Sequence, residues 1–223
     1  MRTLLAVAGL ALGTACSTLS TVTGAKTLEP GQLQIAGAGS LQRGGNPLSI
    51  GTLPLPQGEV VARFGLADNL DMGARLYLVG AAVDVRYRFY HNDRLHLAVA
   101  PGLAGTWAPL VGGTVAGQGS VELRAPVLGE FELSPIHSIM GGPALILRRQ
   151  RNAIDAPELE DARLTRLDAY AGLGARYELH PKRFVLGFSA DLYAQPARHA
   201  GPAWALGVDM GFRSRSRAER RGN

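Results

Sequence analysis

The residues of this chain best suited to chemistry are arginines and carboxylates that stand at alternate positions within apolar stretches. Asp71 and Arg75, for example, alternate with Leu70, Met72 and Ala74. Guanidinium groups pair bidentately with carboxylates in confined places. The pattern therefore predicts a buried network of charges, and its candidate members are Glu59, Arg63, Asp71, Arg75, Asp84, Arg86, Arg88, Glu122, Arg124, Asp168 and Arg176.

Other reactive residue types are dispersed. The five histidines show no metal-ligand spacing, and there is a single cysteine. His91 and His180 are expected in polar turns, and His96 is expected to be a hydrogen-bonded interior residue. His137 and Ser138 are adjacent, so on a strand they would point to opposite faces and could not act as a base and nucleophile. We expect no enzyme activity, no metal and no cofactor.

The elements that must position these charges are β-strands. Strict alternation from Leu70 to Leu78 recurs along most of the chain, which is typical of strands with one apolar and one polar face. Short polar turns alternate with wider breaks, and from a first strand at about Gln32–Leu41 this order predicts ten strands, with both chain termini on the turn side. The least regular strand is His137–Arg148. The predicted turns are Ala67–Asn69, His91–Asp93, Ser134–Ile136 and His180–Lys182, and the wider breaks lie near 42–57, 80–81, 105–114, 149–164 and 194–202.

The apolar faces are predicted to meet lipid. Lysine, which commonly covers the wet faces and edges of soluble sheets, occurs only at positions 26 and 182. Strands of roughly 9–11 residues suit a tilted bilayer crossing. We therefore expect an all-β fold, a closed antiparallel up-and-down transmembrane β-barrel of about ten strands; the alternative is a soluble, lipocalin-like ligand-binding barrel. Aromatic residues of the apolar phase lie near the turns and would form a belt at one membrane interface: Phe64, Tyr87, Phe89, Phe131, Tyr177, Phe184 and Phe212.

The two ends of the chain differ from this pattern. Residues 1–15 have the charge and apolar core of a secretory signal peptide, followed by Cys16 and a linker over 16–31. The barrel is expected over 32–212, with a basic, disordered tail over 213–223. The tail contributes +4 and Arg2 contributes +1, which together account for the net charge of +5, so the barrel is near neutral and no nucleic-acid partner is expected.

Three resemblances extend this interpretation. The strand–turn–strand segment ARFGLADNLDMGARLYL resembles bacterial outer-membrane β-barrel proteins, and WALGVDMGF resembles the terminal signal that the barrel-assembly machinery reads. Leu12 to Cys16 resembles the bacterial lipoprotein signal, which implies lipidation of Cys16; ordinary cleavage with an unmodified cysteine is the alternative. Ser17, in place of aspartate, implies sorting to the outer membrane. The expected surroundings are outer-membrane lipid, with the protein a monomer.

The predicted function is structural, adhesive or surface recognition through the external loops. The loop Arg149–Leu164 is the best candidate for contact with an extracellular ligand, and a helical turn is expected there with Asp155 as its cap and Pro157 near its start. The alternatives are a narrow passive channel for small solutes or ions and an outer-membrane lipid hydrolase. A ten-stranded barrel is close to the size that side chains fill, so a plugged or narrow lumen is expected.

Overall fold

The structure, a computed structural model, describes residues 24–43, 55–77, 80–108, 118–153, 163–195 and 202–214. Among these residues no helix is long and apolar enough to cross a membrane. The strands are β1 (Leu33–Arg43), β2 (Leu55–Ala67), β3 (Leu70–Tyr77), β4 (Gly80–His91), β5 (Leu95–Val99), β6 (Gly102–Ala108), β7 (Gln118–Ser134), β8 (His137–Ala153), β9 (Arg163–Leu179), β10 (Phe184–Ala194) and β11 (Ala203–Arg213).

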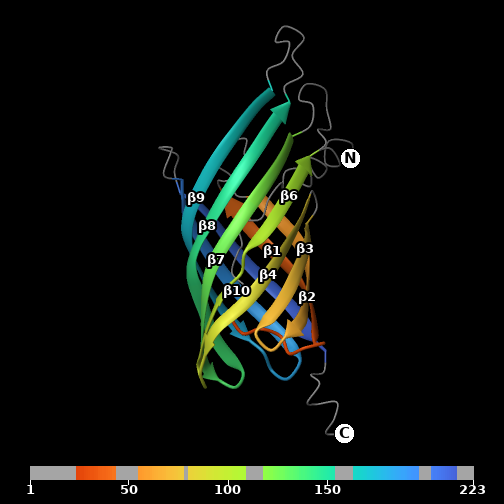
Figure 1. The fold of residues 1–223 in the computed structure, drawn as a ribbon, viewed down its shortest axis with the longest axis vertical. Coiled ribbons are helices and arrows are strands. Elements are labelled where there is room, and N and C mark those ends of the chain that lie inside the picture. Colours follow the sequence, from red (N-terminus) through yellow and green to blue (C-terminus); the bar gives the residue numbers. More distant parts are fainter. Residues whose placement is uncertain are drawn as a thin grey trace, which may run out of the picture.

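These strands close into one antiparallel barrel. Each pairs with its neighbours in the sequence, and β1 pairs with β11 from Gln34–Arg213 to Arg43–Trp204, which leaves no open edge (Figure 1). The strands β5 and β6 share one position between β4 and β7, because Pro101 has no N–H and interrupts the ladder there. The predicted ten-strand barrel is confirmed, with one of its ten strands broken in two.

The two ends of the barrel are built differently. The connections β2–β3, β4–β5, β7–β8 and β9–β10 are short turns at one end of the barrel, which we call the turn end, and the strands β1, β3, β6, β8 and β10 finish at the opposite end, which we call the loop end (Figure 1). The last described residues are also at the turn end, where the Ser214 N–H donates to the Leu33 carbonyl. This is the alternation of turns and loops that the sequence predicts.

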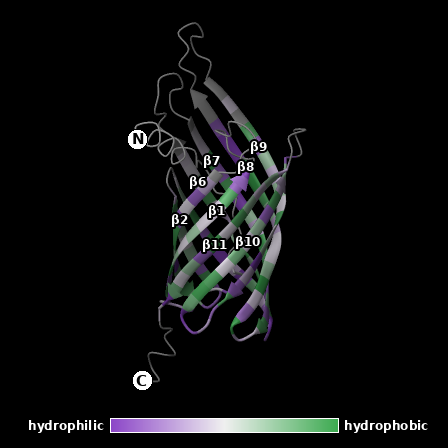
Figure 2. Cartoon of the chain, turned by 180° about the vertical axis from the view of Figure 1, so that it is seen from behind, coloured by the Kyte–Doolittle hydropathy of each residue, from purple (hydrophilic) through white to green (hydrophobic). Residues whose placement is uncertain are grey.

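The apolar side chains point away from the barrel axis. Leu76 is 64% exposed, whereas Asp71 on the other face of β3 is 0% exposed. The same alternation exposes large apolar side chains on the outer phase of the strands, and hydrophobic and hydrophilic residues alternate along the ribbon in Figure 2. The aromatic residues of the expected belt lie on this outer face at the turn end, where Phe184 and Phe212 meet edge to face with centroids 5.5 Å apart. The predicted orientation, apolar outward and charged inward, is confirmed.

Five strands exceed the predicted length of roughly 9–11 residues: β2 and β4 by one or two residues, and β7, β8 and β9 by more. The strands β7, β8 and β9 have 17 residues each, and β8 and β9 rise farthest at the loop end (Figure 1). At a tilt near 40° such a strand spans about 43 Å along the axis, well beyond a hydrophobic band of about 25 Å. The prediction of a loop over Arg149–Leu164 was wrong for residues 149–153 and 163–164, which pair in the β8–β9 ladder. Outside the membrane the outer face of a strand can carry charge, so a charged run does not mark a loop. The expected helical turn at Asp155 and Pro157 lies outside the described residues.

The irregular segment of β8 remains in the sheet because of glycine. A Cβ at Gly142 would lie 1.9 Å from the carbonyl oxygen of Val127 on β7. Glycine therefore allows the two strands to approach each other beside Pro126 and Pro143, where proline removes ladder donors. This explains why β8 runs unbroken through residues 141–143.

The depth dependence of lipid exposure can be tested on β9. Leu173 lies midway along β9, beside Pro143 and Leu192, and Leu167 lies near its loop-end start; they are 66% and 74% exposed. We expect Leu173→Arg to lower the free energy of unfolding in phospholipid vesicles by roughly 2–4 kcal/mol, and Leu167→Arg by roughly 0–1 kcal/mol. Denaturant titration followed by tryptophan fluorescence measures both. Equal losses for the two variants would contradict a lipid-facing exterior.

Candidate functional site: the lumen

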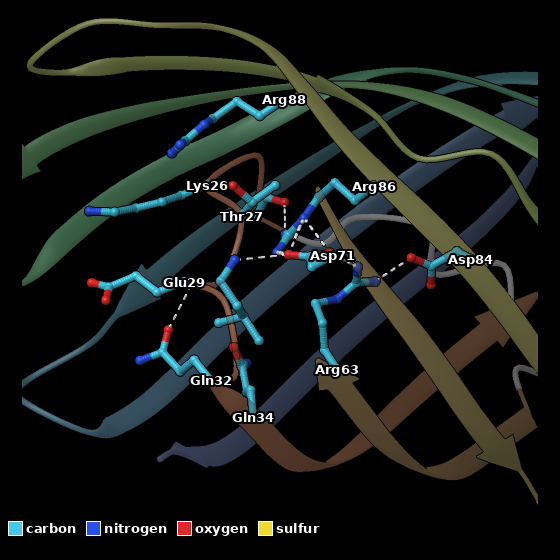
Figure 3. A network of polar contacts seen from close by, with 12 residues as sticks. Lys26, Thr27, Glu29, Gln32, Gln34, Arg63, Asp71, Asp84, Arg86 and Arg88 are labelled. Atoms are coloured by element: carbon cyan, nitrogen blue, oxygen red, sulfur yellow. Dashed lines mark hydrogen bonds and ion pairs between the residues drawn. The ribbon is translucent and has the colours of Figure 1, made fainter. Parts of the chain in front are cut away.

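The first charged cluster lies in the lumen near the turn end and is centred on Asp71 of β3. The Asp71 carboxylate accepts hydrogen bonds from Arg63 on β2 and from Arg86 on β4, and Arg63 also pairs with Asp84 (Figure 3). Asp71 is fully buried, and both arginines are almost so. Removal from water makes each charge costly unless an opposite charge and hydrogen bonds compensate it. The cluster therefore ties β2, β3 and β4 together through charges that cannot separate cheaply.

A second charged cluster lies in the lumen, closer to the loop end than the first. Glu122 on β7 accepts hydrogen bonds from Arg124 Nη2 at 2.6 Å and from Arg148 Nε of β8 at 2.7 Å, and it is fully buried. The Arg148 guanidinium carbon lies 5.1 Å from the ring centroid of Tyr170 on β9. One carboxylate here holds two arginines, and an aromatic face supports the one that is almost fully buried.

The third cluster joins the last strands of the barrel. Arg176 of β9 donates to Glu178 at 2.9 Å and also pairs with Asp209 of β11. Arg213 donates to the other oxygen of Glu178 at 2.8 Å. These contacts link β9 to β11 beside the junction that closes the barrel.

The remaining residues of the predicted charge network lie outside these three clusters. Arg88 donates to the Asn69 side chain and the Asp68 carbonyl at the turn end, and Asp168 accepts from Gln195 at 2.7 Å near the loop end. Arg75 is buried and Glu59 half-buried, and both line an internal cavity. The structure thus distributes the predicted residues over separate clusters instead of one network.

Side chains occupy much of the lumen that the structure describes. One internal cavity of about 70 Å³, room for a few water molecules, lies beside the first and third clusters, and a more open hollow of about 1250 Å³ is lined by residues of β1, β2, β3 and β11. Toward the loop end the buried rings of Tyr77, Tyr170 and Tyr193 project inward with alanine and isoleucine side chains. The arrangement is a packed polar interior, as expected for a barrel of this size.

Part of residues 24–31, which the sequence assigns to a linker, is buried in this lumen, while Lys26, Glu29 and Gly31 are exposed. Ala25 and Leu28 are 0% and 3% exposed, and the segment reaches β1 at the turn end. Sequence reasoning missed this placement because the segment has no periodicity. The small inward residues Ala98 and Ala100 were the available signal, since they leave space where neighbouring strands carry arginine.

Four further residues of the clusters were not among the predicted network. Arg148 was assigned to the least regular strand, and Arg213 to the tail; the structure places Arg213 in β11. Glu178 and Asp209 follow the inward phase of their strands, so alternation alone would have identified them.

The described histidines have structural roles. His96 is buried and lies 3.1 Å from Glu132, and His137 is hydrogen-bonded to the Tyr177 hydroxyl. His180, in the β9–β10 turn, is half-buried; burial and the Arg213 guanidinium lower its pKa, so it is neutral at pH 7. Ser138 points into the lumen, away from its neighbour His137. Within the described ranges no group of three or more His, Cys, Asp or Glu residues could hold a metal ion.

Solved structures resemble this chain in fold at low sequence identity. The translocator domain of autotransporter NalP from Neisseria meningitidis has a TM-score of 0.51 at 11% identity, covering 96% of this chain and 95% of that one. The attachment invasion locus protein Ail of Yersinia pestis gives 0.43 at 14%, covering 83% and 99%. OprG from Pseudomonas aeruginosa gives 0.42 at 8%, covering 86% and 99%. No protein-family model and no curated protein matches the sequence.

The fold is that of an outer-membrane β-barrel. The closed ladder satisfies the backbone without water, and the apolar exterior suits hydrocarbon, so the described barrel has the surface of a membrane-spanning protein. Cys16, the signal peptide over 1–15 and most of the basic tail lie outside the described residues and stay predictions.

The second cluster can be tested with a matched pair of glutamates on β7. Glu122→Gln leaves two buried arginines without their carboxylate and is expected to lower the free energy of unfolding by about 3–5 kcal/mol. Glu132→Gln removes a pair at the rim, where the Lys26 side chain is 47% exposed, and is expected to cost about 0–1 kcal/mol. Denaturant unfolding in the same vesicles compares them. A loss at Glu122 no larger than that at Glu132 would show that the buried pairs contribute no more than exposed ones.

Proposed function

We propose that this protein is a recognition barrel that displays its loop-end segments on the cell surface, with the lumen serving as a structural core. The observation that carries this proposal is the extension of β7, β8 and β9 beyond the span that a bilayer requires. Paired strands are stiffer than a free loop, so the extension holds the paired ends of β8 and β9, Ala153 and Arg163, beyond the membrane. Exposed connections held on a rigid scaffold commonly carry binding functions.

The lumen favours recognition over conduction. Three clusters of buried ion pairs and several tyrosine rings occupy its described part, and the internal cavity is about 70 Å³. Open porins have 16–18 strands, whereas barrels near eight strands are filled by side chains. The passive channel is therefore the weaker of the two candidate functions.

The proposal also includes a lipid anchor and an assembly signal. Lipid attached to Cys16 would add an anchor to the barrel. Phe212, 64% exposed on the outer face of the last strand, would be the aromatic residue that the assembly machinery reads.

The proposal can be tested on cells that express the chain. Replacing residues 154–162 by a Gly-Ser segment of equal length is expected to reduce adhesion to immobilised surface polysaccharide or matrix protein roughly ten-fold, the loss of about 1.4 kcal/mol of binding energy. The same replacement of residues 109–117 is the matched control and is expected to retain most adhesion. The purified barrel is expected to be silent in planar bilayers.

Two results would reject the proposal. Adhesion that is the same with and without the chain would remove the recognition function. Stepwise conductance of the wild-type barrel would favour the channel instead.

A further inference from the structure

Residues Gly24–Pro30 form a segment, here called the strap, that lies across the turn-end half of the lumen. It passes from the wall formed by β7 and β8, where Gly24 is close to Glu130 and Met140, to the β2–β3 hairpin. Ala25, Thr27 and Leu28 are buried. A segment with no secondary structure of its own thus buries three of its seven residues, while Lys26 and Glu29 are exposed.

Side chains on the inner face of the barrel bind the strap mainly through the backbone of the strap. Three charged side chains hold alternate residues of the strap, and two of them belong to the Asp71 cluster (Figure 3). A hydroxyl contact adds to these. The contacts are Arg86 with the Gly24 carbonyl, Glu130 with the Lys26 N–H at 2.8 Å, Asp71 with the Leu28 N–H at 2.9 Å, and the Thr27 hydroxyl with the Asp68 carbonyl at 2.9 Å.

The wall also selects the side chains of the strap. Ala25 is 0% exposed and packs against Ala98, Ala100 and Leu128. Because interiors are close-packed, a larger residue at position 25 would have to displace this wall. The lumen therefore accommodates a small residue at position 25 and, three residues later, the buried apolar side chain of Leu28.

Glycine at position 65 provides the space for the strap on β2. A Cβ at Gly65 would lie 2.0 Å from the carbonyl oxygen of Glu29. The Gly65 backbone also bonds both ways at the end of the strap, accepting from Gly31 N–H at 2.9 Å and donating to the Gln32 carbonyl at 3.0 Å. Backbone thus lies directly on backbone at this point, which only glycine allows.

We propose that the turn-end half of the lumen is a peptide-binding site and that the strap is its resident ligand. The site takes an extended segment with a small residue followed three positions later by an apolar one. It fixes the backbone through Arg86, Glu130 and Asp71. This inference is independent of the recognition proposed for the loops, because it concerns the opposite end of the barrel.

The first experiment releases the strap in the full chain. Leu28→Asp places a carboxylate beside Asp71, and Gly65→Val fills the space under Glu29, so either change is expected to expel the strap. Gly58→Val is the matched control, because a Cβ at Gly58 meets nothing within 4 Å. Mass spectrometry of tryptic cleavage after Lys26 reports release, and heat-modifiable migration verifies that the barrel is folded.

Cleavage after Lys26 is expected to be at least roughly ten-fold faster in the two release variants than in the wild type and in Gly58→Val, because proteolysis follows the population of the open form. A folded Leu28→Asp barrel that stays as resistant as the wild type would overturn the proposal. Leu28→Asp changes only the strap, so the test remains valid if Gly65→Val does not fold.

The second experiment fills the vacated site from outside. A fluorescent peptide with the sequence of residues 24–32 is added to the Leu28→Asp barrel and its anisotropy is recorded. Saturable binding is expected, with binding at least roughly ten-fold weaker to the wild type, whose site is occupied, and to the Leu28→Asp, Gly65→Val double variant. Equal binding of a peptide with the same residues in scrambled order would contradict a specific site.

Discussion

The structure depends on one constraint: within a bilayer, neither a charge nor an unpaired backbone group can face hydrocarbon at low cost. Closing β1 onto β11 satisfies the backbone, and alternation along the strands sends the charged side chains of the membrane-spanning part inward. The lumen is then crowded with buried charged side chains, so the arginines and carboxylates must neutralise one another. Asp71, Glu122 and Glu178 each hold two arginines, which meets that requirement with few carboxylates.

The same constraint explains the interior near the turn end. Clustered charges leave hydrogen-bonding capacity directed into the lumen, and a peptide backbone can use it at alternate N–H and carbonyl groups. Asp71 serves both purposes, because it pairs with Arg63 and Arg86 and accepts the N–H of Leu28. The strap and the ion pairs therefore form one packed unit, in which Gly65 and Ala98 provide the necessary space. Such an interior has the properties of a protein core more than those of a pore.

Alternation made the fold predictable from the sequence. It identified the outer face of Leu76, the inner face of Asp71 and the four short turns, since a register slip of one residue would put Asp71 and Arg75 in lipid. It could not identify the strap, which has no period. The extension of β8 past Arg148 was also missed, because charges can face outward beyond the membrane. Glycine at 142 obscured β8 further, as its role depends on the approach of β7.

The most direct test of this account measures which face of β3 touches lipid. Spin labels are placed one at a time at positions 72 to 76 of a Cys16→Ala chain in phospholipid vesicles, and their collisions with oxygen and with a water-soluble nickel chelate are recorded. The account predicts that oxygen, which concentrates in hydrocarbon, reaches Met72, Ala74 and Leu76 most, and that positions 73 and 75 are shielded. Preferential access of the nickel chelate to Met72, Ala74 and Leu76 would contradict it.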